Sequence, residues 1–451
     1  MRKRNAALMI PLLTLVVFGF ANTINAQTVP ANSCSQTDVQ SAVNSAASGD
    51  TVTVPGGNCT WSGSSGVTVT KAIHLQGNGI GSTVITYTSA SEGSGGVTYS
   101  PTTTEVGKTF ELNGFTFQGG GEYFRPNYPS STAPITGLKI HGNAFNGAAH
   151  HSIHLNGLEF GVFYNNTFST NFISVWVGNA GWAEESYPHV FGSANYPYFE
   201  DNTFGQGAGE FVSETGQGGR LVMRHNTISG YACSGCEVFD IHGDQNSGGG
   251  STSSEYYHNS IDVGASGTYR WLHHRGGQAI IANNTVSRGI AMNFTEYRAV
   301  GQNGICTAYP VILNSAGNSC SPNNESTCIE KQVHNSFYFN NVAGGSQQLP
   351  GYTFGSGGSC GSDPPWGDNQ YVQLNREYWL PTFGLASARP ATCSANGNTY
   401  YGATDTDVIY KCAATNTWNV FYQPFTYPHP LRSGSAAGSP ASPTNLAATV
   451  Q

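Results

Sequence analysis

The chain has 451 residues and a formal net charge of -8, and only 10% of its residues are charged, against roughly 25% in an ordinary globular protein. This composition argues against helix bundles and coiled coils, which are rich in Ala, Leu, Glu and Lys. A hydrophobic share of 38% supports a core and argues against a disordered chain. The 58 glycines favour an all-β protein in which short strands alternate with many turns.

The first 26 residues have the layout of a secretory signal peptide. A basic start (residues 2–4) precedes an apolar run (residues 7–20), and Ala26 supplies the small residue before a cleavage point. The alternative, a membrane anchor, needs a longer apolar run. Removal of the peptide leaves 18 - 3 = 15 basic against 26 acidic residues. The sequence therefore predicts a secreted or cell-surface protein with no nucleic-acid partner and no membrane span.

A short helix is predicted at the start of the mature chain. Ser35 or Thr37 caps a helix that begins near Asp38, Gly49 ends it, and a strand follows from Thr51. One face of this helix is apolar and carries Val39, Ala42, Val43 and Ala46. An open stack of strands exposes unpaired edges and apolar core, so we expect this helix to cover the end of such a stack.

A pattern of alternating apolar residues, an asparagine, a small residue and an apolar residue recurs between residues 139 and 342, within a predicted β-helix domain at residues 27–345. The repeated asparagines are Asn143, Asn166, Asn202, Asn226, Asn259, Asn284 and Asn341. Their spacings are 23, 36, 24, 33, 25 and 57 residues, which fit a unit of about 24 residues with loops inserted. The pattern predicts a parallel β-helix, with a β-sandwich as the alternative. We expect each asparagine to take the left-handed conformation at a corner and to bond the asparagines above and below it.

The sequence also resembles a known family over about residues 30 to 345. The stretches TDVQSAVNSAASGDTVTVPGGNCTW and VTVTKAIHLQGNG, followed by coils of the NNTF type, are similar to exported proteins of the pectin-lyase-like superfamily. The resemblance implies a right-handed parallel β-helix. That superfamily includes lyases, hydrolases, esterases, phage tailspikes and adhesins, so the fold alone does not identify an activity.

The coil pattern is lost towards the C-terminus. Residues 346–432 are dense in Pro, Gly, Cys and Trp and resemble the extension that closes many bacterial β-helix proteins, so we expect a loop-rich, disulfide-bearing extension that packs on or after the helix. Residues 433–451 contain a flexible linker, GSAAGSPASP. The final PTNLAATVQ resembles the first strand of a fibronectin type III module, which predicts an appended module.

Ten cysteines all follow the signal peptide, and an even number in an exported chain predicts disulfides. The predicted pairs are Cys34 with Cys59, Cys233 with Cys236, and Cys393 with Cys412. The connectivity of the other four stays open: Cys306, Cys320, Cys328 and Cys360. A zinc site built from the C-x-x-C at 233–236 with His225 or His242 is the alternative for that pair.

Charged residues gather between Glu210 and Arg298 in a chain that is otherwise poor in charge. The candidates are Glu214, Asp240, His242, Asp244, Arg270, His273, His274, Arg275, Glu296 and Arg298. Their similar phase on successive coils predicts an outward polar groove. Asp240, His242 and Asp244 alternate and should share one face, where the two aspartates are candidate calcium ligands. Residues 273–275 cannot all face outward, so one of the two histidines should be structural.

The stretch LHHRGGQAIIANNTV is similar to the arginine-bearing coil of alginate lyases and chondroitinases of the chondroitinase-B type. The resemblance implies that Arg275 is the catalytic arginine of a lyase that cleaves a uronic-acid glycan. The partner lysine of those enzymes is absent from FVSETGQGG, so the base would be His242, His273 or His274. The residues expected to bind the substrate are Arg270, Asp240, Glu214, Glu296 and Arg298.

Two other functions fit the sequence. A glycoside hydrolase would use two carboxylates from among Asp240, Asp244 and Glu214. A non-catalytic surface protein that binds a glycan would explain the missing lysine and the fibronectin-like tail. The polar cluster favours an enzyme, and the incomplete family motif favours a binding protein.

Overall fold

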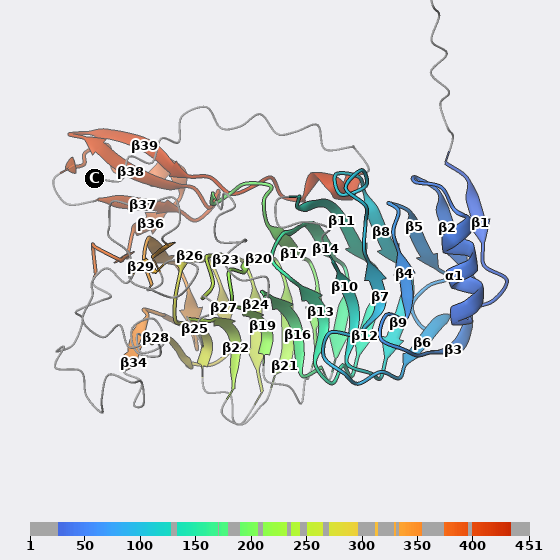
Figure 1. Ribbon diagram of the computed structural model, residues 1–451. Helices are drawn as coiled ribbons and strands as arrows, with labels where there is room; N and C mark the ends of the chain where they lie inside the picture. Colours follow the sequence, from blue (N-terminus) through green and yellow to red (C-terminus); the bar gives the residue numbers. More distant parts are fainter. Residues whose placement is uncertain are drawn as a thin grey trace, which may run out of the picture.

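The computed structural model describes residues 26–127, 133–169, 171–178, 190–205, 211–231, 236–243, 250–264, 270–295, 312–313, 329–330, 333–353, 374–395 and 399–433. Its strands wind into a long stack with three parallel faces, here named sheets A, B and C. Figure 1 shows the stack running from the first strands to the C-terminal strands. The all-β parallel β-helix predicted from the sequence is confirmed, since successive strands pass from sheet A to B to C and then to the next coil.

Each sheet takes its strands from successive coils, except that the last two strands of sheet B form an antiparallel hairpin. Sheet A consists of β1 (Thr28–Pro30), β2 (Thr51–Val54), β5 (His74–Gly77), β8 (Phe110–Asn113), β11 (Ile135–His141), β14 (Glu159–Tyr164), β17 (Pro197–Glu200), β20 (Arg220–Arg224), β23 (Ser253–Tyr257), β26 (Gln278–Ala282), β31 (Ser336–Phe339) and β35 (Tyr378–Trp379). Sheet B consists of β3 (Gly57–Trp61), β6 (Thr83–Tyr87), β9 (Phe115–Gln118), β12 (Ala144–Asn146), β15 (Thr167–Ser169), β18 (Thr203–Phe204), β21 (Thr227–Tyr231), β24 (Ser260–Val263), β27 (Thr285–Val286), β32 (Val342–Ala343) and β33 (Ser346–Gln347). Sheet C consists of β4 (Val67–Val69), β7 (Gly95–Tyr99), β10 (Glu122–Pro126), β13 (His151–Leu155), β16 (Ile173–Val177), β19 (Phe211–Thr215), β22 (Glu237–Ile241), β25 (Arg270–His274), β28 (Ala291–Thr295) and β34 (Gly351–Thr353).

The seven repeated asparagines form one ladder at the corner between sheets A and B, as predicted. Each is at most 1% exposed. The Nδ2 of each of the first six donates to the Oδ1 of the next along the chain, at 2.9–3.2 Å. The backbone N–H of each donates to the same Oδ1. The ladder therefore satisfies the buried amides of neighbouring coils and fixes their register.

The predicted backbone conformation of the ladder asparagines is wrong by one position. The residue before each ladder asparagine carries the positive φ: Gly142, Asn165, Asp201, His225, His258, Asn283 and Asn340, at 51–61°. A short polar or ring side chain there tolerates the left-handed region. The residue before each ladder asparagine therefore makes the turn of the backbone, and the side-chain amide of the asparagine points inward to the ladder.

Aromatic side chains from successive coils stack inside the helix below the ladder. The rings of Phe117, Phe145, Phe168 and Phe204 follow one another at centroid distances of 5.7, 5.1 and 4.6 Å. Each of these residues is at most 1% exposed. Stacked rings of this kind add to the apolar burial that holds the coils together.

The predicted helix covers the first coil. Helix α1 (Gln36–Ser45) begins after Ser35, whose Oγ accepts a hydrogen bond from the Asp38 backbone N–H, and it buries Val39, Ala42 and Val43. It ends at Ser45, four residues before the predicted stop at Gly49. Gly49 instead takes a φ of 92° in the loop that leads into β2.

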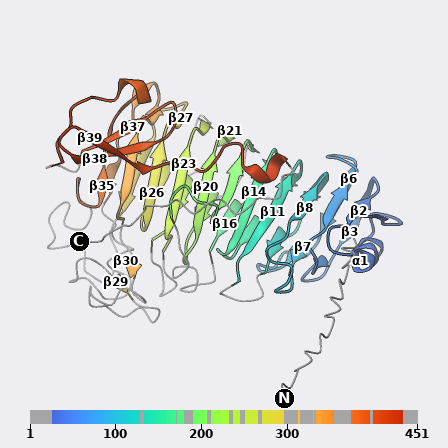
Figure 2. The same ribbon diagram turned by 90° about the horizontal axis from the view of Figure 1, so that it is seen from above.

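The C-terminal extension lies along the outer face of sheet A. A second sheet contains β36 (Thr382–Gly384), β37 (Tyr400–Ala403), β38 (Ile409–Ala414) and β39 (Thr417–Tyr422), and the chain then runs back to the short helix η3 (Pro430–Ser433) beside β11 and β14. Figure 2 shows this extension over the sheet A strands. Short pieces also occur at β29 (Ile312–Leu313), β30 (Ile329–Glu330) and η1 (Ala386–Ala388).

Two of the predicted disulfides are confirmed, Cys34–Cys59 and Cys393–Cys412. Cys236 is also disulfide-bonded. Its predicted partner, Cys233, lies outside the described residues. So do residues 1–25 of the predicted signal peptide, the tail from residue 434, and Cys306, Cys320, Cys328 and Cys360. In the part of the chain that the structure describes, no helix has the length and apolar character needed to cross a bilayer.

Candidate acid–base site on sheet C

Three adjacent strands of sheet C bring predicted site residues into one row. Glu214 on β19 is in register with Asp240 on β22, and Asp240 is in register with His273 on β25. Adjacent strands lie about 4.8 Å apart. The row therefore crosses three coils on the outer face of the sheet, while the neighbouring Phe239 and Leu272 point into the core.

Arg275 forms a two-pronged ion pair with Asp240. Its Nε donates to Asp240 Oδ1 at 3.0 Å, and its Nη2 contacts Oδ2. Burial acts to lower the pKa of Arg275, but the charge of Asp240 outweighs it and the pKa is raised. The sequence predicted that Arg275 lines an open groove. Instead Arg275 is 5% exposed and Asp240 is 0% exposed, because the bidentate pair satisfies both groups away from water.

His242 lies next to the same pair. Its Nε2 is 3.8 Å from Glu214 Oε1, and its Nδ1 is 2.6 Å from the carbonyl oxygen of Gly243. A carbonyl oxygen only accepts, so Nδ1 carries the hydrogen and Nε2 of the neutral ring carries the lone pair. Nε2, the nitrogen that can gain or lose a proton while Nδ1 stays bonded to Gly243, therefore faces Glu214.

Glu237 was missed in the sequence, although it links two predicted residues. It is in register with Arg270. Its Oε1 lies 3.3 Å from Arg270 Nε and 3.3 Å from His273 Nδ1, and His273 Nδ1 also lies 3.9 Å from Asp240 Oδ1. Strict alternation did not find Glu237, because Val238 and Phe239 both lie in the core and positions three apart share the outer face.

His274 does not belong to this cluster. It is 0% exposed, the Tyr338 hydroxyl bonds its Nδ1, and the Gly276 carbonyl bonds its Nε2 at 3.0 Å. Burial lowers its pKa to about 3. The prediction that one of the two adjacent histidines is structural is confirmed, and His273 is the one on the outer face. The suggested base role of His274 has no support in this geometry.

The calcium expectation rests on Asp240 and Asp244. Asp244 lies outside the described residues, as do Glu296 and Arg298. The donor atoms of Glu214, Asp240 and His242 lie within 4.8 Å of one another. Calcium takes six to eight oxygen ligands, whereas this set includes an imidazole and the guanidinium of Arg275 occupies Asp240. The described residues therefore do not fit a calcium ion.

The row of outward residues continues towards the N-terminal coils. Glu214 is in register with Trp176 on β16, and Trp176 with His154 on β13. Trp176 is half-buried, and one of its ring contacts is the imidazole of His151 at a centroid distance of 5.6 Å. Beyond it lies a second cluster, Glu122, His151 and His154. Trp176 and this second cluster lie outside the charge-rich stretch between Glu210 and Arg298, so the density of charged residues did not point to them.

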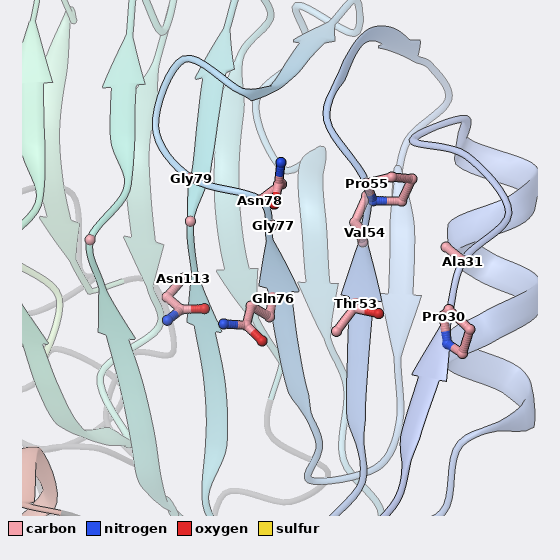
Figure 3. Close-up of a pocket in the computed structure, with 12 residues that line it drawn as sticks. Pro30, Ala31, Thr53, Val54, Pro55, Gln76, Gly77, Asn78, Gly79 and Asn113 are labelled. Carbon is pink, nitrogen blue, oxygen red and sulfur yellow. The ribbon is translucent and has the colours of Figure 1, made fainter.

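A hollow of about 640 Å³ lies elsewhere, on the outer face of the first strands of sheet A. Figure 3 shows Thr53, Gln76 and Asn113 side by side on neighbouring strands there. Its lining contains Pro, Thr, Gln, Asn, Gly, Val and Ala, and none of these side chains titrates near neutral pH. The hollow can hold a ligand by hydrogen bonds, but its lining offers no acid or base, so the candidate acid–base residues are those on sheet C.

No family model, no curated protein and no solved structure matches this chain. The fold and the clusters on sheet C are therefore the basis for any function.

Proposed function

We propose that this protein is an exported polysaccharide lyase of the pectin-lyase-like superfamily that cleaves an acidic, uronic-acid-containing glycan by β-elimination. The single observation that carries the proposal is the gathering of Arg275, His242 and His273 with three carboxylates on successive coils of sheet C. The disulfides Cys34–Cys59 and Cys393–Cys412 support the export, since such bonds persist in oxidising compartments.

In this mechanism Arg275 neutralises the carboxylate of the uronic acid. A guanidinium has five N–H donors, and Asp240 takes two of them. Asp240 thereby holds the planar fork in place for a second, substrate carboxylate. Neutralisation lowers the pKa of the C–H beside that carboxylate, which makes its removal feasible.

His242 then acts as the base and His273 as the acid. The Nε2 of His242 takes the proton from the carbon next to the carboxylate. The electron pair of that C–H bond forms a carbon–carbon double bond, the bond to the leaving glycosidic oxygen breaks, and His273 gives that oxygen a proton. Glu237 at 3.3 Å from His273 Nδ1 favours the protonated imidazole that this step needs.

The test is digestion of a panel of uronate polysaccharides by the mature chain, followed by ultraviolet absorbance of the unsaturated ends. Neutral glycans serve as the substrate control. We expect His242→Ala and Arg275→Ala to lower the rate on the order of 10²-fold or more. Arg288→Ala, at an exposed position that bonds Gly264, is the matched control and should keep full activity. Absence of unsaturated product from every polysaccharide would overturn the lyase proposal.

The burial of Arg275 in its pair with Asp240 favours a second candidate, a non-catalytic β-helix protein that binds a glycan. A pair that is only structural predicts that Arg275→Ala lowers stability without any catalytic readout. Arg275→Lys distinguishes the two, because lysine keeps the charge but loses the bidentate geometry. Glycan binding in a pull-down without cleavage would support the binding protein.

A further inference from the structure

A second cluster of side chains on sheet C is separate from the acid–base site. Glu122 on β10 is in register with His151 on the adjacent β13, and His154 lies three residues after His151 on the same strand. Tyr123 and Phe124 both point into the core, so outward residues recur three positions apart. Glu122, His151 and His154 are 0%, 6% and 0% exposed. The cluster is three strands from Asp240, roughly 14 Å at the usual strand spacing.

The three side chains converge on one point. Glu122 Oε1 lies 3.3 Å from His151 Nδ1 and 2.8 Å from His154 Nδ1, and one donor atom of each residue lies within 4.8 Å of the others. Ligand atoms bound to one zinc ion at about 2.0–2.2 Å are roughly 3.3 Å apart in a tetrahedral site. The His151–Glu122 separation already matches this value, and the His154–Glu122 contact needs to open by about half an ångström.

Two side-chain polar atoms of this cluster are buried and make no hydrogen bond to any described residue. They are Glu122 Oε2 and His154 Nε2. The nearest cation to Glu122 Oε2 is Arg125 Nη1 at 3.6 Å, which is beyond hydrogen-bond distance. The Arg125 side chain is 17% exposed, and its single contact with Glu122 is looser than the two-pronged pair of Arg275 with Asp240. An ion here would replace the hydrogen bonds that the two imidazoles make to Oε1, which also accepts one from the Gly93 backbone N–H at 3.0 Å. The buried Oε2 accepts none and can join as a second carboxylate oxygen, since an unmade hydrogen bond inside a protein is costly.

We propose that Glu122, His151 and His154 bind a divalent transition-metal ion of the zinc class. Two imidazoles and one carboxylate are the donors that zinc accepts, whereas calcium and magnesium prefer oxygen alone. Three protein ligands leave a fourth position for water or a substrate oxygen. The Glu214–Asp240–His242 cluster is less suited to a metal ion. Both carboxylate oxygens of Asp240 already contact the guanidinium of Arg275, whose positive charge repels a second cation.

The proposal is tested on the mature chain without a polyhistidine tag. The protein is stripped with a chelator and titrated with zinc chloride alone by calorimetry, and its metal content as purified is measured by mass spectrometry. We expect one equivalent of zinc with a Kd below about 1 μM, and a zinc-dependent rise in Tm. His154→Ala and Glu122→Gln should each raise the Kd at least tenfold and remove the rise in Tm.

Controls separate this site from other histidines. His258→Ala, a half-buried residue paired with Asp407, should bind zinc as the native chain does. Should His154→Ala fail to fold, Glu122→Gln and His151→Asn carry the same test, because both keep side chains of similar size. Absence of saturable zinc binding by the native chain overturns the proposal. It is equally overturned if His154→Ala and Glu122→Gln bind as tightly as the native chain while His242→Ala loses the ion.

Discussion

The outer faces of sheets A and C belong to the same coils but differ in what they carry. On sheet A the outward side chains of the later coils are apolar and lie under the C-terminal extension, and they include Tyr198, Val222, Tyr257 and Ile280. On sheet C the outward side chains at the same height are charged, with Glu214, Asp240 and His273 in one row. An apolar outer face has to be covered to be stable, whereas a polar one is available for binding and chemistry. The contrast indicates that the extension is a structural cover of sheet A, whereas sheet C carries the polar row from which the function is proposed.

Sheet A also carries charged side chains on its outer face, but these bind the C-terminal extension. Arg224 Nε donates to Glu200 Oε2 at 2.8 Å, and its Nη1 and Nη2 donate to the carbonyls of Phe425 and Thr426 at 2.7 and 2.8 Å. Arg224 and Glu200 are both 0% exposed. Glu255 likewise accepts a hydrogen bond from Tyr422 at 2.6 Å. These contacts join the solenoid to the extension, unlike the contacts within the sheet C cluster.

The largest expected effect is at this junction. Arg224→Ala should lower the free energy of unfolding by about 4 kcal/mol, because it removes one partner of a buried pair and strands two backbone carbonyls. Chemical denaturation measures the change. Arg275→Ala is the matched variant on sheet C and should cost only about 2 kcal/mol, since His273 at 3.9 Å from Asp240 can compensate part of the charge. Equal losses would break the distinction between the two faces.

Replacement of the buried carboxyl of Glu159 should change the free energy of unfolding by a smaller amount that depends on pH. Burial raises the pKa of Glu159, on β14 of sheet A, to about 7. Its folded form is the protonated one, so its contribution to stability is present below about pH 4.5 and is lost as the pH rises through 7. Glu159→Gln should therefore be more stable than the native chain by about 1–2 kcal/mol at pH 8 and equally stable near pH 4.

Glu111 provides the opposite trend as a control. Burial acts to raise its pKa, but hydrogen bonding and charge from His141, His74 and Lys139 outweigh it and hold the pKa at about 2. Its stabilisation is present above about pH 4.5 and is lost as the pH falls towards 2. Thermal melts of Glu159→Gln and Glu111→Gln across pH 3–8 should thus diverge. A Glu159→Gln difference that is constant with pH would contradict the assignment of a neutral buried acid.

The smallest expected effect lies on sheet A beyond the reach of the extension. Gln76 stands in the open row of Figure 3, and Gln76→Ala should change the free energy of unfolding by less than about 0.5 kcal/mol. Ile280→Ala, on the same face but under the extension and 1% exposed, should cost about 3 kcal/mol. Chemical denaturation of these two variants tests whether burial under the extension, and not membership of sheet A, decides how much a side chain contributes to the free energy of unfolding.

Much of the fold was predictable because local signals repeat in every coil. Asn226, for example, was assigned to a ladder from its spacing to Asn202 and Asn259, and its amide bonds run to those residues. The left-handed residue was misplaced by one position, since both His225 and Asn226 are side chains that suit a corner. The site was harder to predict. Glu214, Asp240 and His273 were expected in one groove, but together with His274, which lies in the interior. Glu237 was missed because the two residues before Asp240 point inward.

The sequence by itself determined the repeat, the capping helix, the disulfide pairs Cys34–Cys59 and Cys393–Cys412, and the row of charged positions, because these depend on spacing and side-chain chemistry within each coil. Only the tertiary structure decided that Arg275 is tied to Asp240, that His274 is an interior residue, that Glu122 and His154 converge, and that the extension lies on sheet A. Those outcomes depend on which loops lengthen each coil and on which side chains meet across parallel strands of the stack whose paired residues are 20 to 58 positions apart. Pairing at that range is set by the packing of the whole stack, which no local pattern encodes.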